Sequence, residues 1–225
     1  NIARLDFEYA QGSESGQSAY QVLISGSHKY FSYNAEYLHS SPNYAGSVAN
    51  FDKISGGVRV MPVTNLTLSA GYSQNKYNVD NNIALGAAPI NKTISAGVSY
   101  SIPLLNLSVS VSAFQYNWKD ELSVVNYETD YNQLRSSINY RIRAFNAGVY
   151  AEFNDIETGY DYSTYKFERY GAQAGVLLFE KHRLDLSADY YHNNLAYYNN
   201  TSLLTAAARL MLQISSTTRL NASFS

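Results

Sequence analysis

The chain contains no cysteine, only four prolines and a single tryptophan in 225 residues, and these scarcities exclude several classes of structure. Without cysteine there is neither a disulfide framework nor a thiolate metal site. No apolar run approaches the about 20 residues that a membrane-spanning helix needs, and the mean hydropathy is −0.29. The formal net charge of −2 argues against nucleic acid as a partner.

Tyrosine is the abundant residue, with 22 copies beside 9 phenylalanines. Many aromatics and few charges favour strands over helices. Hydrophobic residues make up 45% of the chain and charged residues 15%, values that describe a folded chain rather than a disordered one. The sequence therefore predicts an all-β protein, with residues 1–225 as one domain.

Apolar and polar residues alternate along many segments. Leu66, Leu68, Ala70 and Tyr72 alternate with small polar residues, and the same period recurs over 3–9, 94–102, 107–113, 147–154, 184–191 and 204–214. A period of two places successive side chains on opposite faces of a strand. We therefore expect strands with one apolar and one polar face.

A hairpin unit recurs every 36 to 41 residues or so, as a tight turn followed by an alternating strand. Tight turns are predicted near 28, 63, 104, 144, 181 and 216. Long polar loops are predicted near 10–18, 39–50, 74–91, 119–130, 155–164 and 193–200. Short turns at one end and long loops at the other are typical of outer-membrane barrels, whose short turns lie in the periplasm.

The short-turn hairpins, the alternating strands and the tyrosine-rich strand ends resemble bacterial outer-membrane β-barrel proteins of the porin-like kind over the whole chain. The resemblance implies an antiparallel up-and-down transmembrane β-barrel in the bacterial outer membrane, surrounded by lipid and lipopolysaccharide. About thirteen strands are visible, whereas bacterial single-chain barrels have an even number. We expect 14 or more in the complete chain, as a barrel cut short or as a segment of a larger wall.

The chain begins Asn1-Ile2-Ala3-Arg4 with strand-like alternation and no visible signal peptide, so we expect a start that is processed or internal to a longer chain. Its last segment, Leu220–Ser225, stops partway along a strand. We expect further sequence at the C-terminal end.

Strands of a soluble β-sandwich also alternate apolar and polar residues, so the composition of the polar face must distinguish a sandwich from a barrel with an aqueous interior. Serine, threonine, glycine, asparagine and tyrosine dominate the polar face, as suits a wide aqueous interior. We expect charges to be confined to this face, because they cost about 2–4 kcal/mol at the lipid midplane. The predicted lumen-facing residues are Arg4, Asp6, Glu8, Glu36, Arg59, Arg135, Arg141, Glu152, Asp185, Asp189 and Arg209. They either create a field that selects solutes or pair and brace the wall.

Aromatic residues on the apolar side predict two belts at the membrane interfaces. Tyr9, Tyr20, Tyr37, Tyr72, Phe153 and Tyr190 lie toward the long loops, and Tyr100 and Tyr140 lie toward the tight turns.

The sequence gives little support for a catalytic site or a metal site. The four histidines, His28, His39, His182 and His192, have no metal-ligand spacing, and alternation separates His192 from Asp189. We predict no enzyme activity, no cofactor and no metal centre. Acidic residues in the outer loops are either solvated or bind Ca²⁺ that bridges to lipopolysaccharide.

A passive pore for small hydrophilic solutes is the leading functional hypothesis. The first alternative is a structural barrel wall whose lumen holds a partner, such as a secretion component or a multihaem cytochrome. A transporter of hydrophobic substrates is the second alternative. Nothing in the sequence identifies the solute, because a barrel scaffold carries many functions.

Overall fold

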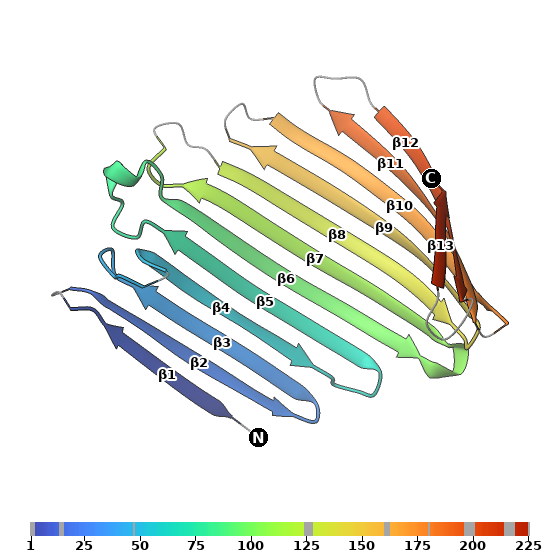
Figure 1. Ribbon diagram of the computed structural model, residues 1–225, viewed down its shortest axis with the longest axis horizontal. Coiled ribbons are helices and arrows are strands. Elements are labelled where there is room, and N and C mark those ends of the chain that lie inside the picture. The colour runs from blue at the N-terminus through green and yellow to red at the C-terminus, as the bar shows by residue number, and fades with distance from the viewer. Residues whose placement is uncertain are drawn as a thin grey trace. The chain divides into compact units, whose positions relative to one another are not determined.

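Thirteen antiparallel strands follow one another in chain order within one sheet (Figure 1). The computed structural model describes residues 3–13, 16–46, 48–123, 128–159, 163–179, 181–195, 201–213 and 219–224. The strands are β1 Arg4–Gln11, β2 Ser18–His28, β3 Phe31–Ser40, β4 Phe51–Val60, β5 Leu66–Tyr77, β6 Pro89–Ile102, β7 Leu107–Asp120, β8 Glu128–Arg141, β9 Phe145–Thr158, β10 Ser163–Leu178, β11 His182–Leu195, β12 Thr201–Gln213 and β13 Arg219–Phe224. Two 3-10 helices, η1 Ile83–Leu85 and η2 Pro103–Leu105, interrupt the connections.

This strand order confirms the all-β, up-and-down prediction and the expected thirteen strands. Among the described residues, each strand pairs with its neighbours in chain order, and β13 does not pair with β1. The structure therefore shows the sheet but not its closure into a barrel. A total of 14 or more strands stays a prediction. No helix in the described part of the chain is long and apolar enough to cross a membrane.

The described residues divide into two compact units that share the middle strands. Unit 1 comprises Asn1–Val98, Ala113–Asn132 and Ile156–Thr164, and unit 2 comprises Ser99–Ser112, Gln133–Asp155 and Tyr165–Ser225. Strands β6 to β10 contribute to both units. That 1–225 form a single domain stays a prediction.

Registered pairing in unit 1 sorts the side chains of β1 to β5, which lie side by side, onto two faces (Figure 1). One row across these strands is Asp6, Leu23, Glu36, Ser55 and Ser73. The adjacent row, on the opposite side, is Phe7, Val22, Tyr37, Ile54 and Gln74. We call the sides of these two rows the polar face and the apolar face.

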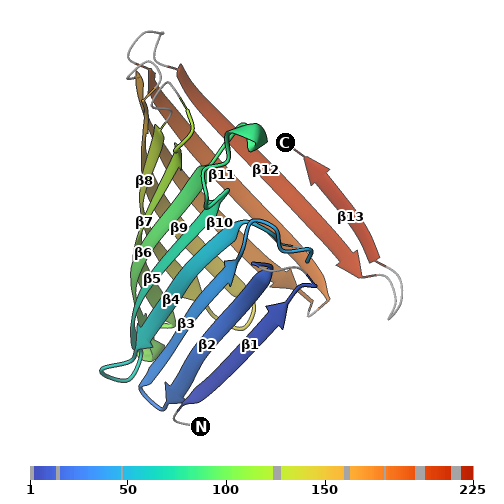
Figure 2. The same ribbon diagram turned by 90° about the vertical axis from the view of Figure 1, so that its left-hand side faces the viewer.

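Unit 2 has the same division, and Figure 2 shows β11, β12 and β13 side by side. Its polar face contains the row Gly175, Asp185, Arg209 and Ser223, whereas its apolar face contains the row Ala174, Leu186, Ala208 and Phe224. A slip of one residue in any strand would exchange its two faces. The register therefore fixes which side chains share a surface.

The apolar faces do not cover a hydrophobic core. Phe51, Ala88 and Ile90 are the buried hydrophobic residues in the described part of the chain. Side chains on the apolar faces are instead exposed: the accessible fraction is 48% for Leu186 and 69% for Leu204. Soluble monomers rarely leave large contiguous apolar surfaces uncovered. We therefore expect lipid on these faces.

The tight turns lie close to the predicted positions and use residues that fit them. Asn65 and Asn106 have positive φ values of 70° and 52°, a left-handed conformation that asparagine tolerates. Pro103 begins η2, where its missing N–H removes no hydrogen bond. The turn predicted near 216 lies outside the described residues, as do 14–15, 47, 124–127, 160–162 and 196–200 in five predicted loops.

The strands extend further into the long connections than predicted. The loop expected at 74–91 spans 78–88, because β5 continues to pair with β4 up to Tyr77 opposite Phe51. Backbone hydrogen bonds continue here after the apolar alternation has ended, and alternation alone could not show them.

Two buried asparagines join the loops of unit 1 at their bases. Asn50 Nδ2 donates to Asn78 Oδ1 at 3.1 Å and to Asp80 Oδ1 at 2.7 Å. The backbone N–H of Asn78 donates to the carbonyl of Asn50 at 2.9 Å, which extends the ladder beyond the strands. These bonds satisfy polar groups that burial would otherwise leave unpaired.

The assignment of faces on β11 makes a stability prediction. Leu186→Arg should lower the free energy of unfolding in phospholipid vesicles by about 2–4 kcal/mol, because it places a charge in hydrocarbon. Ser187→Arg, its neighbour on the polar face, should cost about 0.5 kcal/mol or less. Urea titration followed by Trp118 fluorescence measures both, and equal losses would contradict the assignment.

Candidate functional site

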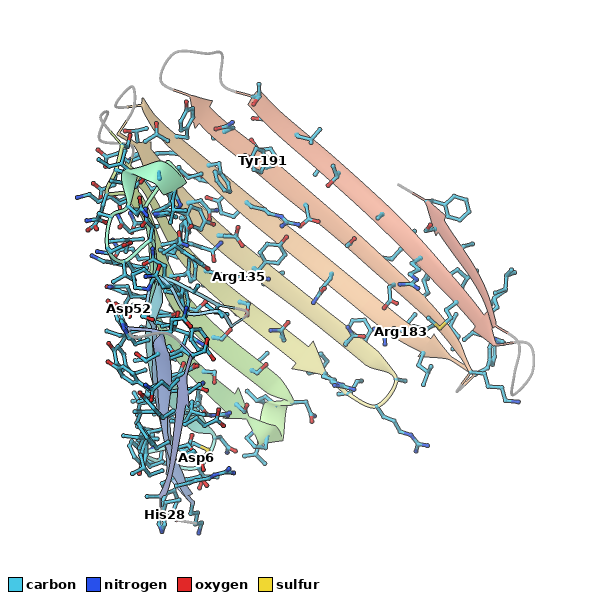
Figure 3. All side chains as sticks on the ribbon, turned by 60° about the vertical axis from the view of Figure 1, so that its left-hand side comes forward. Asp6, His28, Asp52, Arg135, Arg183 and Tyr191 are labelled. Atoms are coloured by element: carbon cyan, nitrogen blue, oxygen red, sulfur yellow. The ribbon has the colours of Figure 1, made fainter. Side chains whose placement is uncertain are left out.

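The polar face is the candidate functional site, because the predicted lumen residues align on it in each unit. Unit 1 carries Arg4, Asp6, Glu8, Glu36 and Arg59 on this face. Unit 2 carries Arg135, Arg141, Glu152, Asp185, Asp189 and Arg209. Figure 3 shows the side chains of unit 2, with Arg135 on β8 and both Arg183 and Tyr191 on β11 labelled. That these residues face a lumen stays a prediction.

Glu36 is the centre of a polar network on unit 1. Its carboxylate accepts hydrogen bonds from Gln21 Nε2 at 2.9 Å and from Ser55 Oγ at 3.4 Å. Lys53 Nζ lies 2.5 Å from the same carboxylate. The three partners come from the strands on both sides of β3, so the network ties β2, β3 and β4 together on the polar face.

Tyr150 is the centre of a second cluster, on unit 2. The guanidinium carbons of Arg135 and Arg169 lie 4.9 Å and 5.4 Å from the centroid of its ring. Its hydroxyl donates a hydrogen bond to the Asp189 carboxylate, which Arg169 approaches at 3.3 Å. Arg135 also lies 3.9 Å from Glu152. The cluster therefore combines cation–π contacts with ion pairs across β8 to β11.

Gly171 makes room for this cluster. A Cβ at this position would clash with the Tyr150 ring and with the Asp189 carboxylate. Gly171 is directly opposite Asp189 in the ladder, so the missing side chain leaves the space that the tyrosine fills. A close approach of a neighbouring group is a common reason for glycine inside a strand.

Charged residues on the polar face are only partly paired. Arg183 Nε donates to both oxygens of Asp185, at 2.8 and 2.9 Å. Within the described residues, the guanidinium groups of Arg59, Arg141 and Arg209 have no hydrogen bond or ion pair. The sequence left two roles open for these charges: to brace the wall by pairing, or to create a field that selects solutes. The polar face is compatible with both.

Sequence reasoning missed Lys53, Arg169 and Arg183 as members of the polar face. Each one occupies a polar position in the alternation of its strand, for example Arg169 in Arg169-Tyr170-Gly171-Ala172 on β10. The period-two pattern of β4 and β10 contained the signal. Tyr150 was placed on the correct face, but its contacts depend on pairing between strands that the sequence does not state.

Of the predicted interface aromatics, Tyr9, Tyr20, Tyr37 and Tyr72 lie on the apolar face of unit 1 and Tyr190 lies on that of unit 2. Phe153 contacts Tyr170, which is on the same face as Tyr190. The same side stays a prediction for Tyr100 and Tyr140. Several contact one another across strands: the ring centroids of Tyr20 and Tyr37 are 5.6 Å apart, and those of Tyr170 and Tyr190 are 6.4 Å apart. Such cross-strand aromatic pairs stabilise a sheet. Their place at the membrane interface stays a prediction.

Charges are not confined to the polar face, contrary to expectation. His39 and Asp52 pair on the apolar face of unit 1, with Nδ1 and Oδ1 2.5 Å apart. Lys76 on the same face lies 2.7 Å from Glu121. These residues lie nearer the long loops than Tyr37 and Tyr72, where the apolar stretch of each strand has already ended. The strands therefore extend past the apolar band, and its outer edge lies at the aromatics.

Groups of three or more histidine, aspartate or glutamate side chains that could hold a metal ion do not occur in the described residues. The polar face thus offers hydrogen bonds, cation–π contacts and charge, which are means of binding and steering a solute.

The hydroxyl of Tyr150 provides a test of the cluster. Tyr150→Phe keeps the ring between the two arginines and removes the bond to Asp189, so it should lower the free energy of unfolding by about 1 kcal/mol. Tyr191→Phe is the matched control, since that hydroxyl has no hydrogen bond to any described residue, and it should change stability by about 0.5 kcal/mol or less. Urea midpoints in vesicles distinguish them. Equal effects would mean that the Asp189 bond contributes nothing.

Comparison with solved structures finds outer-membrane proteins at low sequence identity. OmpT of Vibrio cholerae aligns with a TM-score of 0.59 and 13% identity, over 92% of this chain and 74% of that chain. An anion-selective porin from Comamonas acidovorans aligns with a TM-score of 0.54 and 14% identity, over 91% of this chain and 59% of that chain. The siderophore receptor PirA from Acinetobacter baumannii aligns with a TM-score of 0.64 and 10% identity, over 99% of this chain and 43% of that chain.

Neither a protein-family model nor a curated protein sequence matches the chain. The chain spans about three quarters, three fifths and two fifths of the three structures above. At these identities the likeness concerns the fold. The chain shares with these structures a fold of successive antiparallel strands.

Proposed function

We propose that the chain forms the wall of a diffusion pore for small hydrophilic solutes in the bacterial outer membrane. One observation carries the proposal: a single sheet has an exposed apolar face and a polar face on which some charges lack partners among the described residues. Lipid covers the first face and water the second. Backbone groups in the bilayer core must be paired, so in a membrane the sheet closes into a barrel or joins a larger wall.

Passage through this pore is diffusion without a conformational cycle. Solutes keep much of their hydration while serine, threonine and asparagine side chains exchange hydrogen bonds with them. Charged side chains bias which ions enter, because a wall of low dielectric on one side strengthens their field. Lipid and lipopolysaccharide are the partners of the apolar face and the long loops.

The charge balance favours anions. In unit 2 the polar face carries Arg135, Arg141, Arg169, Arg183 and Arg209 against Glu152, Asp185 and Asp189. In β1 to β5 of unit 1, Arg4, Lys53 and Arg59 balance Asp6, Glu8 and Glu36. The excess of arginine in unit 2 gives the pore a modest preference for anions.

The experiment is single-channel recording of the detergent-purified full-length protein in planar bilayers, with heat-dependent gel migration as proof of folding. Steady ohmic steps and a reversal potential on the anion side in a KCl gradient are expected. A folded protein without conductance would contradict the pore and favour a structural wall or a lumen filled by a partner.

Arg209→Gln should lower the chloride-to-potassium permeability ratio by roughly a factor of two, because it removes an unpaired cation from the polar face. Lys166→Gln removes a cation from the apolar side of β10, where Lys166 pairs with Asp155 at 3.1 Å, and should leave the ratio nearly unchanged. Equal shifts from both variants would contradict the placement of charges on two faces.

A further inference from the structure

The polar face of unit 2 contains a hollow at the end near the tight turns. Its volume is about 450 Å³, within the roughly 300–1,000 Å³ range of small-molecule sites. The polar groups that line it include Asn106, Ser108, Asn139, Arg141, Asn146 and Gln173. They come from the turn after η2 and from β7 to β10. All of them belong to unit 2.

Hydrogen-bonding groups in this hollow lack protein partners. Within the described residues, the Arg141 guanidinium and the Asn146 and Gln173 side-chain amides make no hydrogen bond or ion pair. Asn139 makes one, a long bond of 3.3 Å from Nδ2 to Ser137 Oγ. Arg135, Arg169 and Arg183 on the same face are all paired with carboxylates. The hollow thus differs from the Tyr150 cluster, whose charges satisfy one another.

Two glycines lie beneath asparagines that line the hollow. A Cβ on Gly148 would clash with Asn139 Oδ1, and a Cβ on Gly175 would clash with Asn146 Oδ1 and with Asp185 Oδ1. Each asparagine therefore lies over a glycine of the next strand, which leaves its amide beside the open volume. Serine or alanine at these two positions would displace the amides.

The lining has a definite chemical complement. A side-chain amide presents both a donor and an acceptor, as a hydroxyl group does, so several amides suit a molecule rich in hydroxyls. The guanidinium of Arg141 suits a carboxylate, which it binds through two parallel hydrogen bonds. The described residues that line the hollow include no acidic side chain; the Asp185 carboxylate lies beside Asn146 at Gly175 and is paired with Arg183.

We propose that this hollow is a binding subsite for polyhydroxylated carboxylates, the class of sugar acids. The proposal rests on the pore function and names the solute class that the pore would favour. The amides hold the hydroxyls and Arg141 holds the carboxylate. A neutral polyol leaves the arginine unused, and a simple carboxylate leaves the amides unused, so both bind more weakly.

Three probes separate these contributions: gluconate, sorbitol and butyrate. Gluconate has both groups, sorbitol lacks the carboxylate and butyrate lacks the hydroxyls. Binding to the folded full-length protein is measured by ligand-observed NMR in detergent, and block of single-channel current is measured in bilayers. Gluconate should half-saturate at a concentration about tenfold lower than either of the others.

Variants test the residues. Arg141→Gln should raise the half-saturating concentration of gluconate to that of sorbitol. The double variant Asn146→Ala with Gln173→Ala should raise it to that of butyrate. Arg209→Gln, on the same face outside the hollow, controls for general attraction of anions. It should affect gluconate and butyrate alike and leave their ratio unchanged. Heat-dependent migration confirms that each variant folds.

Equal binding of the three probes, or gluconate binding that survives Arg141→Gln, would overturn the subsite. Conductance without any gluconate preference would overturn the subsite and leave the pore intact. Gluconate binding that depends on Arg141 in a protein without conductance would support the subsite and overturn the pore.

Discussion

Continuous backbone pairing between neighbouring antiparallel strands is the constraint on which the rest of the structure depends. Each register pair fixes two side chains on one face and sends their neighbours to the other, so the choice of partners across β1 to β5 and across β10 to β13 decides both surfaces at once. Pairing also removes N–H and C=O groups from the surroundings, which an apolar medium requires.

The two faces differ in what their side chains do. On the apolar face, large side chains stand open, and the charged pairs near the long loops mark where the strands pass beyond the apolar band. On the polar face, some charges satisfy one another, as around Tyr150, while others, such as Arg141, have no partner among the described residues. Satisfied clusters brace neighbouring strands, and unsatisfied groups are the ones free to meet a solute.

Alternation made the faces predictable from the sequence. Leu184, Leu186 and Ala188 against Asp185, Ser187 and Asp189 already place residues 184–189 of β11 on their observed sides. Strand ends were less predictable, because β5 goes on pairing after its apolar residues stop at Tyr72. The Tyr150 cluster and the hollow beside Arg141 could not be predicted, since both depend on which residues of adjacent strands stand opposite and on the glycines beneath them.

Accessibility along one strand tests the central claim, that one face meets lipid and the other water. The natural chain has no cysteine, so single cysteines at 184 to 191 on β11 report without background. In vesicles, a membrane-impermeant maleimide should label positions 185, 187, 189 and 191 rapidly and positions 184, 186, 188 and 190 slowly. Uniform labelling along the strand, or rapid labelling of the even positions, would contradict the account.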